Sequence, residues 1–350
     1  MKRIKLTILA LILATAPMLG QENVTFQKPS QEIMQLADFD RAPSVSMNSK
    51  KDWMLLSYRN TYKSLEELNK DELRLGGLRI DPNTNISSTA TFINNLKVKR
   101  VSDKTDTQVK GLPTNALISN LIWSPDETKL AFTNTTASGN ELWIVELQTA
   151  TATKLTDAVL NANLGNPITW YKNGTALLIK VIPANKKALI DAAKAIPNGP
   201  IVSESQEGVV SPNRTYQDLL KNKTDEANFE NIVTSELYTI DLKCTKKLFK
   251  AADLYAGETF SPDGSYILLT TIQKPFSYLV PLNRFPMKTV AYKANGEEVS
   301  VVNNVALSEI LPKGFMAVRE GKRSMSWRAD KPATLFFVEA LDGGDPANKV

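Results

Sequence analysis

One turn motif returns along the chain, and it limits what the chain can fold into more than any other feature. The clearest copy is Trp123-Ser-Pro-Asp-Glu-Thr-Lys-Leu-Ala-Phe-Thr-Asn134, which reads as an aromatic residue, a turn and an apolar strand. Ser, Pro and Asp suit the first three positions of a type I turn, because Pro fixes φ at the second position and Asp tolerates the third. A second copy begins at Phe260 and has the preferred Gly264 at its fourth position. Looser copies begin at Val45, Trp170 and Trp327.

Further strand-like segments follow the clearest copies of this motif. Glu141–Leu147 and Thr151–Thr156 follow the Trp123 copy. Lys288–Tyr292 and Glu298–Val302 follow the Phe260 copy, and the Asn295-Gly296 pair between them is a strong hairpin signal. Four antiparallel strands in a unit of roughly 40–50 residues are typical of a β-propeller blade.

We therefore predict an all-β fold, an incomplete β-propeller of four-stranded blades with about five blade motifs and short helical insertions. The continuous apolar run Ile267–Leu269 indicates a strand that is buried on both faces, as in a blade packed between neighbours. A β-sandwich is the competing architecture, but it does not require one motif to recur.

The amino terminus has the pattern of a secretory signal peptide. Lys2, Arg3 and Lys5 precede the apolar run Leu6–Leu13, and small and polar residues follow it. We predict a signal peptide over residues 1–21 and an exported protein, periplasmic or extracellular, with no membrane association after cleavage. A membrane anchor is the alternative, although the run is short for a span.

Composition narrows the possible partners. The chain is 42% hydrophobic and 23% charged, as in an ordinary globular protein. Its net charge of +5 is dispersed along the sequence, so we expect no nucleic-acid partner. Cys244 is the only cysteine, which excludes a disulfide within the chain.

The predicted propeller domain covers residues 22–350 and is interrupted by helical insertions at about 64–76 and 183–231. Ser64 and Glu67 form a capping box at the start of the first insertion, and Gly76-Gly77 ends its helical pattern. A separate short helix is expected over Gln31–Ala37. The second insertion is expected to hold helices over Asn185–Ala195, Thr215–Asn222 and Thr224–Glu230.

Several longer stretches resemble the amino-terminal region of bacterial serine peptidases of the prolyl-oligopeptidase (S9) family, in its glutamyl-endopeptidase-like branch. They are Arg59–Leu68, Glu72–Ile80, Asn161–Trp170, Asn213–Asn222, Lys274–Tyr278, Gly321–Thr334 and Val338–Pro346. The resemblance implies an exported peptidase in which a propeller precedes an α/β-hydrolase domain and filters peptide substrates by size.

The chain departs from that family where the chemistry should lie. It has no histidine and no Gly-x-Ser-x-Gly motif, so it contains no Ser-His-Asp triad, and we assign no catalytic residue. A Ser–Lys pair is the alternative, but no spacing singles one out. With no histidine and one cysteine we expect neither a metal site nor a cofactor. The chain alone is not expected to be an active peptidase.

The sequence stops after one strand of the Trp327 copy, and the hydrolase domain that the resemblance implies does not follow. We therefore expect the amino-terminal part of a longer protein, whether as a gene fragment, a truncated product or a split subunit, whose partner is the missing carboxy-terminal hydrolase domain. The alternative is a stand-alone exported propeller that acts as a binding or scaffolding module.

Candidate substrate-binding residues follow from the resemblance. If the preference of the relatives for acidic side chains applies, a carboxylate must meet a cation, ideally the bidentate fork of Arg. Arg214, Arg284 and Arg323 lie in family-like stretches at loop or strand-end positions. An ordinary surface or interblade ion pair is the alternative for each. Paired glutamates bind the peptide amino terminus in dipeptidyl-peptidase relatives, but here the helix cap already accounts for Glu67 of the Glu66-Glu67 pair.

Overall fold

The computed structural model of the chain describes residues 28–191, 194 and 215–349. The predicted signal peptide, residues 1–21, and Arg214 lie outside the described residues. The chain divides into two units, one that ends at Asp40 and one that runs from Arg41 onward. In the first unit the predicted helix is confirmed as α2 (Gln31–Ala37).

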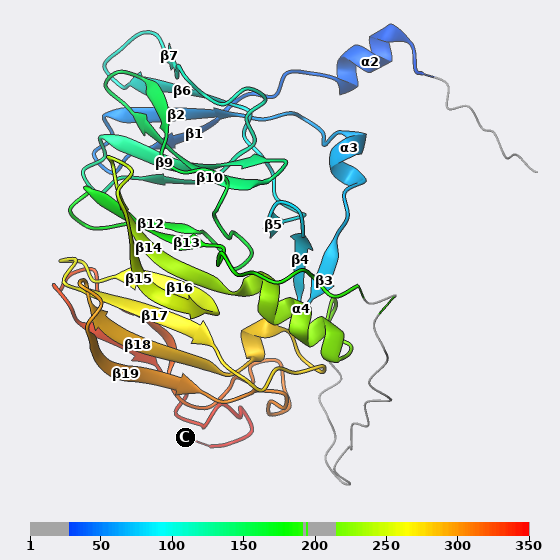
Figure 1. The fold of residues 1–350 in the computed structure, drawn as a ribbon, viewed down its shortest axis with the longest axis vertical. Coiled ribbons are helices and arrows are strands. Elements are labelled where there is room, and N and C mark those ends of the chain that lie inside the picture. The colour runs from blue at the N-terminus through cyan, green and yellow to red at the C-terminus, as the bar shows by residue number, and fades with distance from the viewer. Residues whose placement is uncertain (1–27, 192–193, 195–214, 350) are drawn as a thin grey trace, which may run out of the picture. The chain divides into compact units, whose positions relative to one another are not determined.

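The second unit is built from antiparallel sheets that follow one another along the chain (Figure 1). Four sheets have four strands each, and the strands lie side by side in the order of the sequence. The strands of these sheets are β1 (Ser44–Met47), β2 (Trp53–Tyr58), β6 (Asn95–Arg100) and β7 (Thr107–Gln108); β8 (Ile118–Trp123), β9 (Lys129–Thr136), β10 (Gly139–Glu146) and β11 (Thr151–Lys154); β12 (Ile168–Trp170), β13 (Ala176–Val181), β14 (Ser235–Asp241) and β15 (Lys246–Asp253); β16 (Tyr255–Phe260), β17 (Tyr266–Ile272), β18 (Met287–Lys293) and β19 (Glu298–Val305). A sheet of two strands follows, β20 (Arg323–Trp327) and β21 (Leu335–Val338). The predicted all-β class and its four-stranded unit are confirmed.

Each copy of the turn motif joins the first and second strands of one sheet. The last residue of the first strand always pairs with the start of the second strand, as in Met47 with Met54, Trp123 with Leu130, Trp170 with Leu177, Phe260 with Ile267, and Trp327 with Leu335. The four aromatic residues therefore occupy equivalent positions, as predicted from the repeat.

The two Ser-Pro-Asp turns share one hydrogen-bond network. Ser124 Oγ donates to Asp126 Oδ1 over 2.6 Å and accepts the backbone N–H of Lys129 over 3.0 Å. Ser261 makes the same pair of contacts, with Asp263 Oδ1 at 2.6 Å and the N–H of Tyr266 at 3.0 Å. The hydroxyl thus holds the turn to the first residues of the next strand.

Consecutive turns contact each other in the order of the sequence. The Glu127 carboxylate accepts the backbone N–H of Ser49 over 2.8 Å, which links the first turn to the second. The later turns are also close: a Cβ added at Gly174 would lie 3.8 Å from Asp126, and one added at Gly264 would lie 2.7 Å from Cβ of Lys172. The N–H of Asp263 donates to the carbonyl oxygen of Pro332 over 3.1 Å. Each sheet therefore lies next to the sheet that follows it in sequence, at least at its turn.

Alternate residues on the second strands of the second and third sheets pack against different neighbours, so these two sheets are buried on both faces. On β9, Leu130 and Phe132 belong to the core shared with the first sheet, whereas Ala131 belongs to the core shared with the third. On β13, Leu177 faces the second sheet and Leu178 the fourth. A strand between two cores needs apolar residues at every position, which explains the continuous apolar runs.

The two insertions differ from their predicted structures. In the first, the capping box is confirmed, but α3 (Leu65–Leu68) is a single turn and the rest forms a small sheet of β3 (Leu73–Leu75), β4 (Leu78–Asp81) and β5 (Ile86–Ser87). In the second, α4 (Lys223–Val233) confirms the last predicted helix and extends it. The helix predicted over 215–222 is wrong, and so is the one over 185–195 in its described part.

Candidate functional site

Three long connections leave the sheets at one end, which we call the insertion end. They join the second and third strands of the first, third and fourth sheets and comprise residues 59–94, 182–234 and 273–286. Since every first strand ends in a turn motif and the second strand runs back, the insertion end lies opposite the turns. The third connection contains a short 3-10 helix, η1 (Leu282–Arg284).

A shared apolar core holds the three connections together. It includes Ile80 from the first, Phe229 and Ile232 from α4 in the second, and Phe276 and Phe285 from the third. Phe229 has its ring centroid 5.1 Å from that of Phe276 and 5.7 Å from that of Phe285, both edge to face. Figure 1 shows α4 beside β3 and β4. The described parts of the three connections are therefore packed against one another.

A cavity of about 220 Å³ opens at the insertion end, next to α3. We call it the α3 pocket. Its lining includes three cations (Arg41, Arg59, Lys63), one carboxylate (Glu67), and the aromatic rings of Tyr62 and Phe92.

The charges in the α3 pocket are unbalanced. Glu67 Oε2 accepts the backbone N–H of Ser64 over 2.7 Å in the capping box, so its position is set by the helix. No carboxylate among the described residues lies within ion-pair distance of Arg41, Arg59 or Lys63. Arg59 Nε is buried and has no hydrogen-bond partner in the described structure. Among the described residues, Lys63 Nζ has one hydrogen-bond partner, the backbone carbonyl of Ser88 at 3.5 Å.

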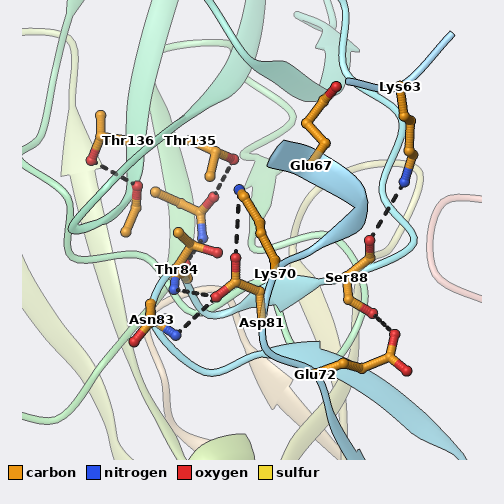
Figure 2. Close-up of polar contacts among 12 residues, drawn as sticks. Lys63, Glu67, Lys70, Glu72, Asp81, Asn83, Thr84, Ser88, Thr135 and Thr136 are labelled. Atoms are coloured by element: carbon orange, nitrogen blue, oxygen red, sulfur yellow. Dashed lines mark hydrogen bonds and ion pairs between the residues drawn. The ribbon is translucent and has the colours of Figure 1, made fainter. Parts of the chain in front are cut away.

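A second, much smaller cavity of about 20 Å³ adjoins the α3 pocket and is close to the size of one water molecule. The buried Asp81 carboxylate lies at its wall and accepts the backbone N–H groups of Asn83 and Thr84 over 3.0 and 3.3 Å (Figure 2). Lys70 Nζ lies 3.7 Å from Asp81 Oδ2. Asp81 is thus committed to its turn and to Lys70, which leaves the cations of the α3 pocket without it.

Buried asparagines connect the first insertion to the second sheet. Asn140 Nδ2 donates to the carbonyl oxygens of Thr84 and Asn85 over 2.7 and 3.1 Å. Asn85 Oδ1 accepts Lys186 Nζ over 2.6 Å, and burial lowers the pKa of Lys186. These contacts fix the β4–β5 turn below the pocket against neighbouring elements.

Two of the predicted substrate-binding arginines lie at the insertion end, near a different cavity. This cavity of about 570 Å³ is bordered by the end of β19 and by residues 306–312 and 319–322. Arg284 donates to the carbonyl oxygen of Ser308, which lines the cavity, over 3.4 Å, and its guanidinium lies 5.5 Å from the ring centroid of Tyr216.

Arg323 follows directly after the cavity-lining Lys322 and begins β20. Its Nε atom is buried and has no hydrogen-bond partner within the described ranges. Burial, together with the positive charge of Arg323, lowers the pKa of the neighbouring Arg319. Arg284 and Arg323 therefore border the same region, and a substrate role for Arg214, Arg284 and Arg323 stays a prediction.

The cations of the α3 pocket were not singled out by sequence reasoning. Arg59 and Lys63 lie in a family-like stretch, but Arg41, Phe92 and Leu117 join them only through the pairing of β1, β2 and β6 and through the bridge between Ile93 and Ile118. The positive charge of a pocket assembled from distant segments leaves no local pattern. In the sequence, the only indication of this pocket was that Arg59 and Lys63 lie four residues apart in one loop.

Neither a metal-binding cluster nor a histidine base is found among the described residues. They contain no group of three or more His, Cys, Asp or Glu side chains placed to hold a metal ion. The whole sequence has no histidine to act as a base for a serine nucleophile. Within the same residues, no helix is both long and apolar enough to span a lipid bilayer. The arrangement can bind and position ligands, chiefly anionic ones.

Comparison with known proteins gives relatives over nearly the whole chain. No model of a known protein family matches. A protein of Oryza sativa subsp. japonica named "Probable glutamyl endopeptidase, chloroplastic" is 32% identical over 333 residues, which is 91% of this chain and 35% of that protein. A protein of the same name from Arabidopsis thaliana is 31% identical over 342 residues, 93% of this chain and 35% of the relative. The chain thus spans about a third of the length of these relatives.

Among solved structures, the acylaminoacyl peptidase of Pyrococcus horikoshii matches 78% of this chain and 34% of its own, with a TM-score of 0.41 and 14% identity. The two sequence relatives agree with the resemblance found in the sequence itself. The chain is therefore a member of the S9 peptidase family, related to glutamyl endopeptidases, and it corresponds to the amino-terminal part of such a protein.

Proposed function

We propose that this chain is the substrate-gating β-propeller portion of an exported serine peptidase, and that an α/β-hydrolase domain outside this chain supplies the chemistry. The observation that carries the proposal is a 32% identity with a glutamyl endopeptidase over 333 residues, in a chain that has no histidine. The relationship supports peptide hydrolysis by the whole protein. Because the chain has no histidine, this part of the protein has no Ser-His-Asp triad.

The repeat geometry supports a propeller arrangement of the sheets. Four sheets have the same strand order, each starts with the same turn position, and consecutive turns touch. Each of the inner sheets is buried on both faces by its neighbours in sequence. Repeated sheets of this kind arranged about a common axis form a propeller.

We place peptide contact at the insertion end. The α3 pocket, Arg284 and Arg323 all lie there, and each adds positive charge. Loops on a rigid scaffold are the usual location of binding residues. A cationic face suits peptides with acidic side chains, including those with Glu at the cleavage site, because guanidinium groups pair with carboxylates through two parallel hydrogen bonds.

Peptidase assays on two proteins test the proposal. One is the 350-residue chain, and the other is the same chain joined in frame to the hydrolase segment encoded downstream of it. We expect no cleavage of Glu-containing peptides by the first, and cleavage of short peptides but not of folded proteins by the second. A serine-directed fluorophosphonate serves as the control, since it should abolish all turnover.

Two results would count against the proposal. Peptide cleavage by the 350-residue chain alone, if the fluorophosphonate abolishes it, would show that this chain contains the catalytic residues. A downstream frame that encodes no Gly-x-Ser-x-Gly, Asp and His would favour a stand-alone binding module.

A further inference from the structure

We propose that the α3 pocket is a carboxylate-binding site that takes the acidic group of a peptide. This deepens the proposed function, on which it rests, by naming a ligand chemistry for one site. It is tested by binding alone, so that its failure can be told from a failure of the proposed peptidase function.

The first step is the uncompensated positive charge. Arg41, Arg59 and Lys63 line a cavity of about 220 Å³ with a single carboxylate, that of Glu67. Glu67 is held by the N–H of Ser64 at 2.7 Å and forms no ion pair with the three cations in the described structure. Like charges gathered in one concave site repel one another, and an anion that enters relieves that repulsion.

The second step is the unused donor. Arg59 Nε is shielded from solvent and donates to no described atom. A buried N–H without an acceptor costs free energy, more so when it belongs to a charged group. The guanidinium that carries this donor lines the pocket, so an anion that enters the pocket compensates its charge. A carboxylate suits it well, because its two oxygens match the guanidinium fork.

The third step is the shape of the rest of the wall. The rings of Tyr62 and Phe92 and the side chain of Leu117 line the same cavity as the cations. An apolar wall beside a cationic end fits a carboxylate on a short hydrocarbon stem better than a bare inorganic anion. The side chain of Glu has this form, and so does the carboxy-terminal residue of a peptide.

Fluorescence anisotropy with labelled pentapeptides distinguishes these two sources. One peptide has a central Glu and an amidated carboxy terminus, a second has Gln in its place and is also amidated, and a third has Gln and a free carboxy terminus. We expect at least one of the two carboxylate peptides to bind the 350-residue chain at least about tenfold more tightly than the neutral peptide. Binding should weaken as salt is raised. Equal binding of all three peptides would overturn the proposal.

Variants locate the site. Arg59→Gln and Lys63→Gln should each weaken carboxylate binding, by about tenfold for Arg59, whereas Arg100→Gln should not. Arg100 is a matched control because it lies on β6 of the same sheet, stacked on Trp53 and outside the pocket. Lys63 is exposed, so its replacement tests the site even if Arg59→Gln disturbs folding. Unchanged binding by Lys63→Gln and Arg59→Gln would place the ligand elsewhere.

Glu67→Gln gives the sharpest test, because the proposal predicts tighter carboxylate binding by this variant. Glutamine can still accept the N–H of Ser64, so the capping box survives. The substitution removes the one negative charge from the lining, and carboxylate binding should tighten by roughly twofold to fivefold. If Glu67 had only a structural role, replacing it would not tighten carboxylate binding. Weaker binding by a variant whose thermal unfolding is unchanged would contradict the assignment.

Discussion

Lys180 and Glu258 form an ion pair between the third and fourth sheets, and their side chains are only 3% and 7% exposed. Lys180 Nζ lies 3.2 Å from Glu258 Oε2 and also donates to the carbonyl oxygens of Leu164 and Tyr255, at 2.6 and 3.4 Å. Burial raises the pKa of Glu258, although Lys180 acts against this. Glu258 Oε1 has no partner in the described structure. The pair therefore joins two sheets while part of its hydrogen-bonding capacity is unused.

Replacing Lys180 by Met should lower the free energy of unfolding by about 3–5 kcal/mol, because it leaves a buried carboxylate and two carbonyl groups without their donor. The double variant Lys180→Met with Glu258→Leu should recover a large part of that loss, since no charge then remains buried. Urea denaturation followed by tryptophan fluorescence measures both. A single variant as stable as the original chain would show that the pair contributes little.

Asp263 gives one turn a dependence on pH. The hydrogen bond from Ser261 is the main cause that lowers the pKa of its carboxylate below its ordinary value of 3.8, and Ser265 adds to it. A carboxylate with a lowered pKa in the folded state stabilises the fold above its unfolded pKa, and that contribution disappears as the pH falls through the folded value.

The melting temperature should therefore fall as the pH is taken from 5 to below about 3.8, and Asp263→Asn should reduce that fall. Asp103→Asn is the control, since Asp103 is an exposed residue outside the repeated turns. Scanning calorimetry over this pH range measures the effect. Identical pH profiles for Asp263→Asn and the original chain would contradict the role assigned to this turn.

At the scale of elements, the contact between consecutive turns depends on glycine. Gly264 has φ +75°, and a Cβ added there would lie 2.7 Å from Cβ of Lys172 in the preceding turn. Gly165 has φ +72°, but a Cβ added there would meet nothing within 4 Å. The two positions have nearly the same φ and differ in whether a neighbouring turn lies against them.

Gly165→Ala should cost about 1 kcal/mol of stability, the usual penalty for a side chain in the left-handed region. Gly264→Ala should cost clearly more, because the two turns must also move apart. The difference between the two variants, from chemical denaturation, isolates the contact between sheets. Equal losses of stability in the two variants would mean that the turns can move apart without affecting the packing of the sheets.

Sequence reasoning succeeded where local chemistry decides the structure. The Ser-Pro-Asp turns, the hairpin around Asn295-Gly296 and the cap at Ser64 each depend on residues within a few positions of one another. The short helix expected over 215–222 failed for the opposite reason. Residues there are fixed by distant partners, as when Asp218 accepts Arg79 Nε over 2.8 Å and its carbonyl accepts the N–H of Gly77.

The candidate site was harder to predict from the sequence than the fold. The resemblance identified the stretch that contains Arg59 and Lys63, but not the pocket, because Arg41 and Phe92 reach it from separate loop segments. Charge balance in a cavity depends on which carboxylates are already committed. That Glu67 is held by a cap and Asp81 by its turn becomes visible only in three dimensions.

At the scale of the whole molecule, the fifth sheet differs from the others. It has two strands, and the large side chains of β21 are open: Phe336, Phe337 and Val338 are 44%, 42% and 48% exposed. Since Trp327 pairs with Leu335 as Trp123 pairs with Leu130, Phe337 corresponds to Phe132, which is 0% exposed. The same strand position is therefore covered in the second sheet and uncovered in the fifth.

We expect the 350-residue chain to self-associate through β21, because it offers both an unpaired strand edge and apolar side chains. Light scattering of size-exclusion peaks at two protein concentrations should show mass that rises with concentration. The double variant Phe336→Ser with Phe337→Ser should shift the chain toward monomer. Val101→Ser, which removes a side chain that is 43% exposed elsewhere, should not. A chain that stays monomeric at both concentrations and melts cooperatively would show that β21 is protected, and that the fifth sheet needs no further strand to be stable.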